Sequence, residues 1–429
     1  MLGQVIRLGG NLVMARLLAP EMFGAMSIAV TVGMILFMFS DLGLAQNIVQ
    51  SPRGNDPVFL DTAWVVQIVQ GVALFFVMLL LSSALYFANL AGIVPVKSVY
   101  ASTELPFVIA AYSVSVVISS FQSTKMATAY RNLDQRRIIQ ISLISQLSGL
   151  VIMIIIGVMT RSIWALVAGA LVTSIASVVL GHTWLQGHSN RFRYDKKALH
   201  ELFDFGKWIF VSSALYILTM NGDKLLLSTF VAADVLGLYV IASLFVTAIN
   251  NTLERLYAGI SLPALSEFAR NDPSRLREIY NRLCIPSDLL LIFLAGFLFE
   301  TGRWLIAVLY DPRYMAAGDI LQILALSLFA VRYEVARQAY LALNVPYYGT
   351  VMSVVRFLSL CTLVPSLYYI NGIQGAIWGI ALHPLAAVPF VYVFNSKLGL
   401  LDWRRESISL LVLPFGFLFG FALNQLITR

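Results

Sequence analysis

Long apolar segments recur along the whole chain and are separated by short polar connections. Apolar segments of about 18 or more residues are long enough to cross the hydrocarbon core of a membrane as helices. The pattern predicts an all-α polytopic transmembrane bundle with about thirteen spans, at residues 2–18, 25–48, 62–88, 105–124, 138–159, 163–186, 208–230, 236–258, 285–299, 317–343, 348–369, 373–395 and 408–426. Charged residues interrupt residues 300–316, where we expect a surface or re-entrant segment and no further span.

The composition supports this interpretation. Of 429 residues, 59% are hydrophobic and 12% are charged, against about 25% charged in ordinary soluble domains. A net charge of +7 could indicate a nucleic-acid partner, but the basic residues fall in short clusters between apolar segments and form no recognised binding motif. The two cysteines and four histidines have no metal-ligand spacing, so the sequence predicts neither a metal site nor a cofactor nor a nucleophilic enzyme site.

The basic residues of the connections fall mainly on one side of the predicted membrane. The connections after even-numbered spans hold seventeen, namely Arg53, Lys125, Arg131, Arg136, Arg137, Arg191, Arg193, Lys196, Lys197, Lys207, Arg270, Arg275, Arg277, Arg282, Lys397, Arg404 and Arg405. The opposite side holds six, namely Arg16, Lys97, Arg161, Arg303, Arg313 and Arg429. Because Lys and Arg are retained in the cytoplasm during insertion, the even-span connections are predicted to be cytoplasmic.

A weak internal repeat divides the chain into two halves. Residues 19–29 match residues 232–242 at a constant offset, with Gly24 paired to Gly237. Six spans separate the copies, so they have the same orientation in the membrane, and parallel repeats of this kind form two bundles with a substrate site between them. We therefore expect an N-terminal six-helix lobe at 1–186, a cytoplasmic linker at 187–207, a C-terminal six-helix lobe at 208–395 and an extra helix at 396–429.

Charged residues inside the predicted spans are the candidate functional residues. A charge at the centre of a bilayer costs at least a few kcal/mol, so it should face protein or a wet cavity. Six of these residues are basic, namely Arg7, Lys224, Arg255, Arg332, Arg337 and Arg356. Four are acidic, namely Asp41, Asp223, Glu254 and Glu334. Arg7 and Arg332 lie deepest, and we expect both to face a shared wet cavity.

Simpler roles remain open for several of these residues. Glu334 and Arg337 are spaced i, i+3 and can neutralise each other on one helix face. Arg255 and Arg356 lie near enough to span ends to extend toward the interface. Asp41, Asp223, Glu254 and Glu334 are either structural partners of basic groups or proton-coupling carboxylates.

Two stretches carry a resemblance to a known family. The run that starts at Asn11 reads Asn-Leu-Val-Met-Ala-Arg-Leu-Leu-Ala-Pro-Glu-Met-Phe-Gly and is followed by Phe-Ser-Asp-Leu-Gly-Leu-Ala-Gln. The second half contains Gly222-Asp223-Lys224 and then Val235-Leu236-Gly237-Leu238-Tyr239. Both stretches resemble bacterial polysaccharide transporters of the MOP flippase superfamily, which include Wzx-type flippases of O-antigen and exopolysaccharide repeat units.

The resemblance implies twelve to fourteen helices in two lobes that operate by alternating access in the bacterial inner membrane. It implies transfer of an undecaprenyl-pyrophosphate-linked oligosaccharide from the cytoplasmic to the periplasmic leaflet, with no catalysis. Substrate-binding cavity cations would then be Arg7, Lys224, Arg332, Arg337 and Arg356. Partners would include the lipid-linked sugar, membrane lipids, a polysaccharide polymerase and the export machinery. No signal peptide is visible, and the resemblance implies a first helix that starts earlier and a further last helix.

Three other functions compete with this interpretation. A MATE-like small-molecule exporter has the same two-lobed plan, but its often cationic substrates favour an excess of intramembrane acids. A membrane-embedded polysaccharide polymerase or ligase would require a large outer loop, whereas the outer connections here are short. A scaffold or receptor would not require paired repeats.

The charge distribution predicts the membrane topology. Single cysteines that replace Arg136, Lys196 or Arg277 should be protected from an impermeant thiol reagent in intact cells, because basic connections resist translocation. Cysteines at Lys97 and Arg161 should be labelled. Labelling at position 196 in intact cells would overturn the orientation.

Overall fold

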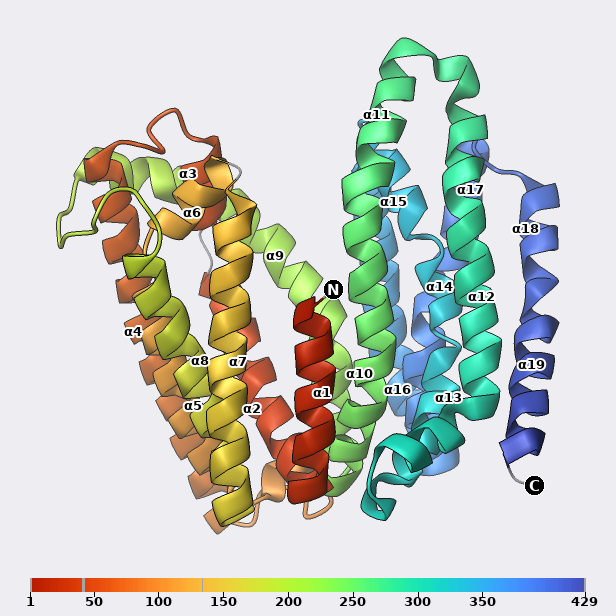
Figure 1. Ribbon diagram of the computed structural model, residues 1–429, viewed down its shortest axis with the longest axis horizontal. Coiled ribbons are helices and arrows are strands. Elements are labelled where there is room, and N and C mark those ends of the chain that lie inside the picture. Colours follow the sequence, from red (N-terminus) through yellow and green to blue (C-terminus); the bar gives the residue numbers. More distant parts are fainter. Residues whose placement is uncertain (1, 41–42, 133, 428–429) are drawn as a thin grey trace. The chain divides into compact units, whose positions relative to one another are not determined.

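The computed structural model describes residues 2–40, 43–132 and 134–427. These residues form α-helices joined by short connections and contain no strand (Figure 1). Nine of the described helices are long and apolar enough to cross a membrane, and ten if the bent pair α5 and α6 counts as one span. The chain is therefore a polytopic helical membrane protein.

The compact unit formed by residues 1–237 contains nine helices and the first residues of a tenth. They are α1 (Leu2–Leu17), α2 (Pro20–Ser40), α3 (Leu44–Gln50), α4 (Pro57–Leu90), α5 (Leu105–Ser120), α6 (Lys125–Arg131), α7 (Gln135–Thr160), α8 (Trp164–Thr183), α9 (Lys196–Phe230) and α10 (Ala233–Leu256). Helix α7 packs against α8, α4 against α5, and α9 against α2.

The second unit, residues 238–429, receives most of α10 and nine further helices. These are α11 (Leu262–Asn271), α12 (Leu276–Leu309), α13 (Ala316–Ala325), α14 (Leu328–Val331), α15 (Glu334–Ala342), α16 (Tyr347–Leu382), α17 (Val388–Lys397), α18 (Trp403–Leu410) and α19 (Val412–Ile427). Helix α12 packs along α19 and against α13 (Figure 1). The two six-helix lobes and their linker stay a prediction. The two compact units meet between Gly237 and Leu238, which lie within α10.

Each of the thirteen predicted spans corresponds to helical structure, but several boundaries differ from the prediction. Residues 300–309 continue α12 and do not form a surface or re-entrant segment. The predicted span 317–343 is broken into α13, α14 and α15, with Arg332 in the second break. Spans 348–369 and 373–395 are separated as predicted, because Asn371 and Gly372 inside the range of α16 have non-helical backbone angles and divide it into two helices. Gly372 has φ of 57°, a conformation that residues with a Cβ rarely adopt.

The repeated glycines mark a close helix crossing at the starts of α2 and α10. A Cβ on Gly24 would lie 2.0 Å from the carbonyl oxygen of Ala233, and one on Gly237 would lie 1.8 Å from that of Pro20. Any larger side chain at either position would force the two backbones apart. The two copies of the sequence repeat therefore pack on each other through their matched glycines.

Candidate functional site

Two groups of charged side chains come together within the second unit. In the first group, the Glu334 carboxylate at the start of α15 accepts hydrogen bonds from two arginines. Arg337 Nε donates to Oε2 at 2.7 Å, and Arg356 Nη1, from α16, donates to Oε1 at 2.9 Å. The carboxylate is 10% exposed, the Arg356 side chain 14% and the Arg337 side chain 34%. This arginine–glutamate triad is thus partly exposed.

Glu254 of α10 belongs to the surroundings of the triad. Its carboxylate interacts electrostatically with Glu334, Arg337 and Arg356. Among the described residues it forms no direct ion pair. Among the described side chains, this group contains two guanidinium groups and two carboxylates, and Glu334 is the carboxylate that accepts hydrogen bonds from both arginines.

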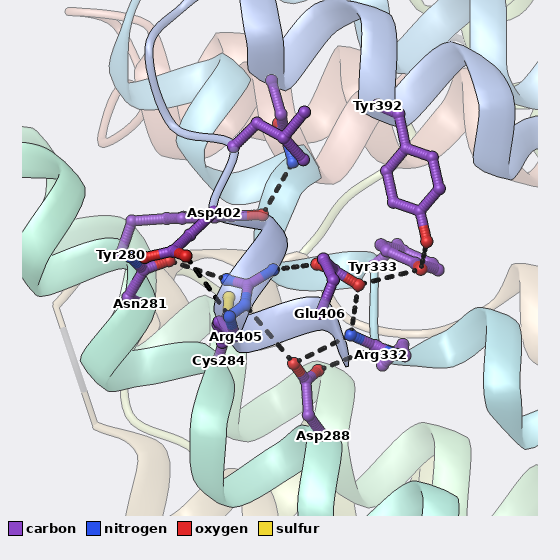
Figure 2. Close-up of polar contacts among 12 residues, drawn as sticks. Tyr280, Asn281, Cys284, Asp288, Arg332, Tyr333, Tyr392, Asp402, Arg405 and Glu406 are labelled. Atoms are coloured by element: carbon purple, nitrogen blue, oxygen red, sulfur yellow. Dashed lines mark hydrogen bonds and ion pairs between the residues drawn. The ribbon is translucent and has the colours of Figure 1, made fainter. Parts of the chain in front are cut away.

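The second group surrounds Arg332, whose side chain is fully buried. Its guanidinium donates to both oxygens of Asp288 of α12 at 3.2 Å and to Glu406 Oε2 of α18 at 2.5 Å (Figure 2). Its plane also lies over the rings of Phe329 and Tyr333, 5.4 and 4.9 Å from their centroids. A buried guanidinium requires such partners because removal from water costs several kcal/mol.

Arg405 completes this buried charge network. It pairs with Glu406, lies 3.8 Å from Asp288, and donates to Asn281 Oδ1 at 3.0 Å. Glu406 also accepts a hydrogen bond from the Tyr333 hydroxyl. Figure 2 shows the two arginines and two carboxylates as one continuous set of contacts that joins α12, the break before α15, and α18. The network is charge-balanced and closed to solvent.

These contacts correct three expectations from the sequence. Arg332 does not face a wet cavity in this conformation, and its anion-binding role stays a prediction. Asp288 lies within the predicted span 285–299 and Glu406 within the helix that begins at Trp403, so the count of four intramembrane acids was too low. Arg405, counted among the loop cations, is a buried residue of α18. The sequence feature that could have revealed this network was the position of Asp288 inside an apolar span.

The remaining candidate residues lie elsewhere. Arg7 is an exposed residue of α1, and Lys224 of α9 donates to Asn221 Oδ1 at 3.3 Å. Asp223, beside Lys224, is half-buried. Asp41 and the side chain of Arg255 lie outside the described residues. Since these positions precede Leu238 or are not described, a shared site that joins them to the arginine–glutamate triad remains a prediction.

Comparison with known proteins assigns the family. Residues 13–318 match the family described as polysaccharide biosynthesis protein. The chain belongs to this family. The match covers the first unit from residue 13 onward and the second unit as far as the start of α13.

One curated relative and two solved structures extend this result. The chain is 22% identical over 321 residues to the succinoglycan biosynthesis transport protein ExoT of Rhizobium meliloti (strain 1021), covering 73% of this chain and 61% of ExoT. Its fold is similar to the inward-facing conformation of a multidrug resistance MATE family transporter of the MOP superfamily, with TM-score 0.72, 12% identity and coverage of 92% and 94%. It is also similar to the lipid II flippase MurJ in an inward closed conformation, with TM-score 0.65, 13% identity and coverage of 100% and 98%. The family member described here therefore has the MOP-superfamily fold.

The buried charge network predicts a difference in stability between two acidic substitutions. Glu406→Gln leaves Arg332 buried with one carboxylate fewer, and such a loss costs about 3–5 kcal/mol. We expect a clear fall in the apparent unfolding temperature of the detergent-purified protein, followed by tryptophan fluorescence at a fixed scan rate. The control is Asp319→Asn, which removes the partner of the exposed Arg303 and should change the temperature little. Equal unfolding temperatures for both variants would contradict the prediction.

Proposed function

We propose that the protein flips an anionic, lipid-linked oligosaccharide from the cytoplasmic to the periplasmic leaflet of a bacterial inner membrane. The observation that carries this proposal is the match to a polysaccharide biosynthesis family over residues 13–318. The transport function in the name of ExoT and the fold shared with a lipid II flippase over the whole chain support it. Transfer of a polar headgroup between leaflets requires a polar surface inside the membrane, which charged residues within spans supply.

The arginine–glutamate triad is the part of the second unit best suited to the headgroup. Guanidinium groups bind phosphate oxygens through a planar fork of N–H donors. Glu334 accepts one hydrogen bond from Arg356, whose guanidinium has five N–H donors. The buried Arg356 Nε has no hydrogen-bond partner among the described residues. Arg337 and Arg356 are therefore proposed to contact the pyrophosphate or an acidic sugar.

Glu334 has a positioning role in this proposal. Its carboxylate holds two long side chains from different helices in one place, which reduces the conformational entropy lost when a headgroup binds. Arg7, Lys224 and Arg332 are cavity cations expected from the sequence. We propose that they contact the headgroup in other conformations of the transport cycle. A polysaccharide polymerase and the export machinery are the proposed partners that receive the flipped unit.

Substitution of the two arginines tests the proposed site. Arg337→Gln and Arg356→Gln should each reduce flipping in proteoliposomes that contain an undecaprenyl-pyrophosphate oligosaccharide by about tenfold or more, because each removes a charge-assisted hydrogen bond worth roughly 1.5–3 kcal/mol. Lys should restore activity only in part, since an ammonium group lacks the planar fork. Arg303→Gln, which removes an exposed arginine paired with Asp319, is the matched control.

Two outcomes would contradict the proposal. Normal flipping by the double Arg337→Gln, Arg356→Gln variant at normal abundance would exclude the triad as the headgroup site. If the wild-type protein flips no lipid-linked sugar but exports a small cation, the MATE-like alternative replaces the flippase.

Substitution of Glu254 tests the charge balance around the triad. Glu254→Gln removes the carboxylate that interacts electrostatically with both arginines, so an anionic headgroup should bind more tightly. We expect the apparent Kd for the lipid-linked sugar to fall several-fold, measured by equilibrium binding to detergent-purified protein. Glu254→Asp, which keeps the charge, should change it less. Weaker binding by the Gln variant would show that Glu254 supports the site and does not compete for it.

A further inference from the structure

The connection between α8 and α9 is attached to the rest of the first unit by polar contacts. The Asp61 carboxylate accepts hydrogen bonds from the His188 ring at 2.7 Å and from the backbone N–H of Arg191 at 2.9 Å. Asn190 Nδ2 donates to Thr124 Oγ1 at 2.6 Å. The connection lies at the same end of this unit as α3 and α6 (Figure 1). Residues 191–197, here called the basic–aromatic segment, thus have a defined position.

The basic–aromatic segment combines unpaired cations with exposed rings. Its four basic residues are exposed and have no acidic partner among the described residues, namely Arg191, Arg193, Lys196 and Lys197. Phe192 and Tyr194 are 74% and 54% exposed. Tyrosine commonly occupies the headgroup region of membranes, because its ring is apolar and its hydroxyl meets water, and the phenylalanine ring adds an apolar surface beside it.

Other cations from the predicted cytoplasmic side differ in this respect. Arg53 pairs with Asp56 and Glu201, and its guanidinium holds the pKa of Asp56 below its ordinary value. Arg137 pairs with Asp134, and Arg275 with Glu278. Acidic partners partly neutralise these arginines, whereas the four cations of the basic–aromatic segment form no ion pair among the described residues and outnumber its single carboxylate, Asp195.

The stability of α9 does not explain the two lysines. Lys196 and Lys197 are the first two residues of α9, where the helix dipole already places positive partial charge. Cations at this end are unfavourable by roughly 0.3–1 kcal/mol each. Asp195, the N-cap whose carboxylate accepts from Ala198 N at 3.0 Å, offsets part of that cost. An external anion would be attracted by the lysines and by the helix end together.

The segment lies at a depth that suits lipid headgroups. Helix α4 has 34 residues, a length of about 51 Å, so it exceeds the hydrocarbon core of about 30 Å. At least one end of α4 therefore extends beyond the core, and its first turns are at the end predicted to reach the cytoplasmic headgroup region. Trp64 lies two turns into α4, and the ring of Phe192 packs on it with 4.9 Å between centroids. This contact holds the segment beside the same region.

We propose that the basic–aromatic segment binds the anionic phospholipid headgroups of the cytoplasmic leaflet. Cations near an anionic surface gain about 1 kcal/mol each, and the exposed rings would enter the interface beside them. The inference is independent of the transported substrate. It adds a lipid-recognition surface to the first unit and uses none of the residues assigned to flipping.

Photo-crosslinking of the full chain in proteoliposomes tests this surface. The photoreactive amino acid p-benzoylphenylalanine replaces Phe192, and the vesicles contain equal amounts of phosphatidylglycerol and phosphatidylcholine without any lipid-linked sugar. Mass spectrometry identifies the attached lipid. We expect phosphatidylglycerol to be enriched at least about threefold, with the enrichment reduced in 0.5 M salt because screening shortens the range of the charges.

Matched variants distinguish an effect of the basic–aromatic segment from an effect of the total charge of the protein. The test variant carries Arg191→Gln, Arg193→Gln, Lys196→Gln and Lys197→Gln, and it should lose the enrichment. The control variant carries Arg53→Gln, Arg137→Gln, Arg275→Gln and Arg277→Gln. It removes the same total charge from paired positions, since Arg277 lies 3.9 Å from Asp402, and it should keep the enrichment. A third variant with Arg191→Lys and Arg193→Lys preserves the charge and should also keep it.

Three results would overturn the proposal. They are equal capture of the two lipids by the wild-type segment, undiminished enrichment in the test variant, and an equal loss in the control variant. None depends on flipping, since no substrate is present, so failure here leaves the proposed function untouched. Failure of the flipping assay would likewise leave this surface intact.

Discussion

Arg332 can be buried in the second unit only because two carboxylates are buried with it. Asp288 comes from α12 and Glu406 from α18, while Arg332 occupies the break between α14 and α15. These contacts join segments that are up to 118 residues apart in sequence. An unpaired charge in that position would cost several kcal/mol, so the three segments must reach their positions together. Helix α18 is in this way integrated into the second unit.

The same residue type has a different chemical role a few residues away. Arg332 has its donors directed at enclosed carboxylates and rings, and its side chain is fully buried. Arg337, five positions later, shares one carboxylate with Arg356 and remains 34% exposed. In this conformation, Arg332 is enclosed by two carboxylates, whereas Arg337 is partly exposed and contacts one carboxylate. The arginine–glutamate triad has the second character, and for this reason it carries the proposed headgroup contact.

In the first unit too, the position of a basic residue in the fold decides its role. Basic residues that look alike in the sequence divide into those whose side chains form ion pairs, such as Arg53, and those whose side chains form none among the described residues, such as Arg191 and Arg193. Lys125, another connection cation, is buried and donates its ammonium group to the carbonyl of His182 at 2.8 Å. Only the cations without partners can offer their charge to a membrane surface.

The sequence by itself determined the helical membrane fold, because apolar segments of spanning length allow few other structures in lipid. It also determined the repeat, since the matched Gly24 and Gly237 were visible as an offset and prove to be a backbone crossing. Likewise, the i, i+3 spacing of Glu334 and Arg337 predicted their pairing on one helix face.

Only the tertiary structure decided which charges neutralise one another across helices. The contact of Arg356 with Glu334 spans 22 positions, and that of Glu406 with Arg332 spans 74. No periodicity along one helix encodes such pairs, because they depend on which faces of separate helices meet. The burial of Arg332 likewise depended on contacts between separate helices. Depth within a span predicted that Arg332 must avoid lipid, but whether it met water or protein was settled by the packing of α12 and α18 around it.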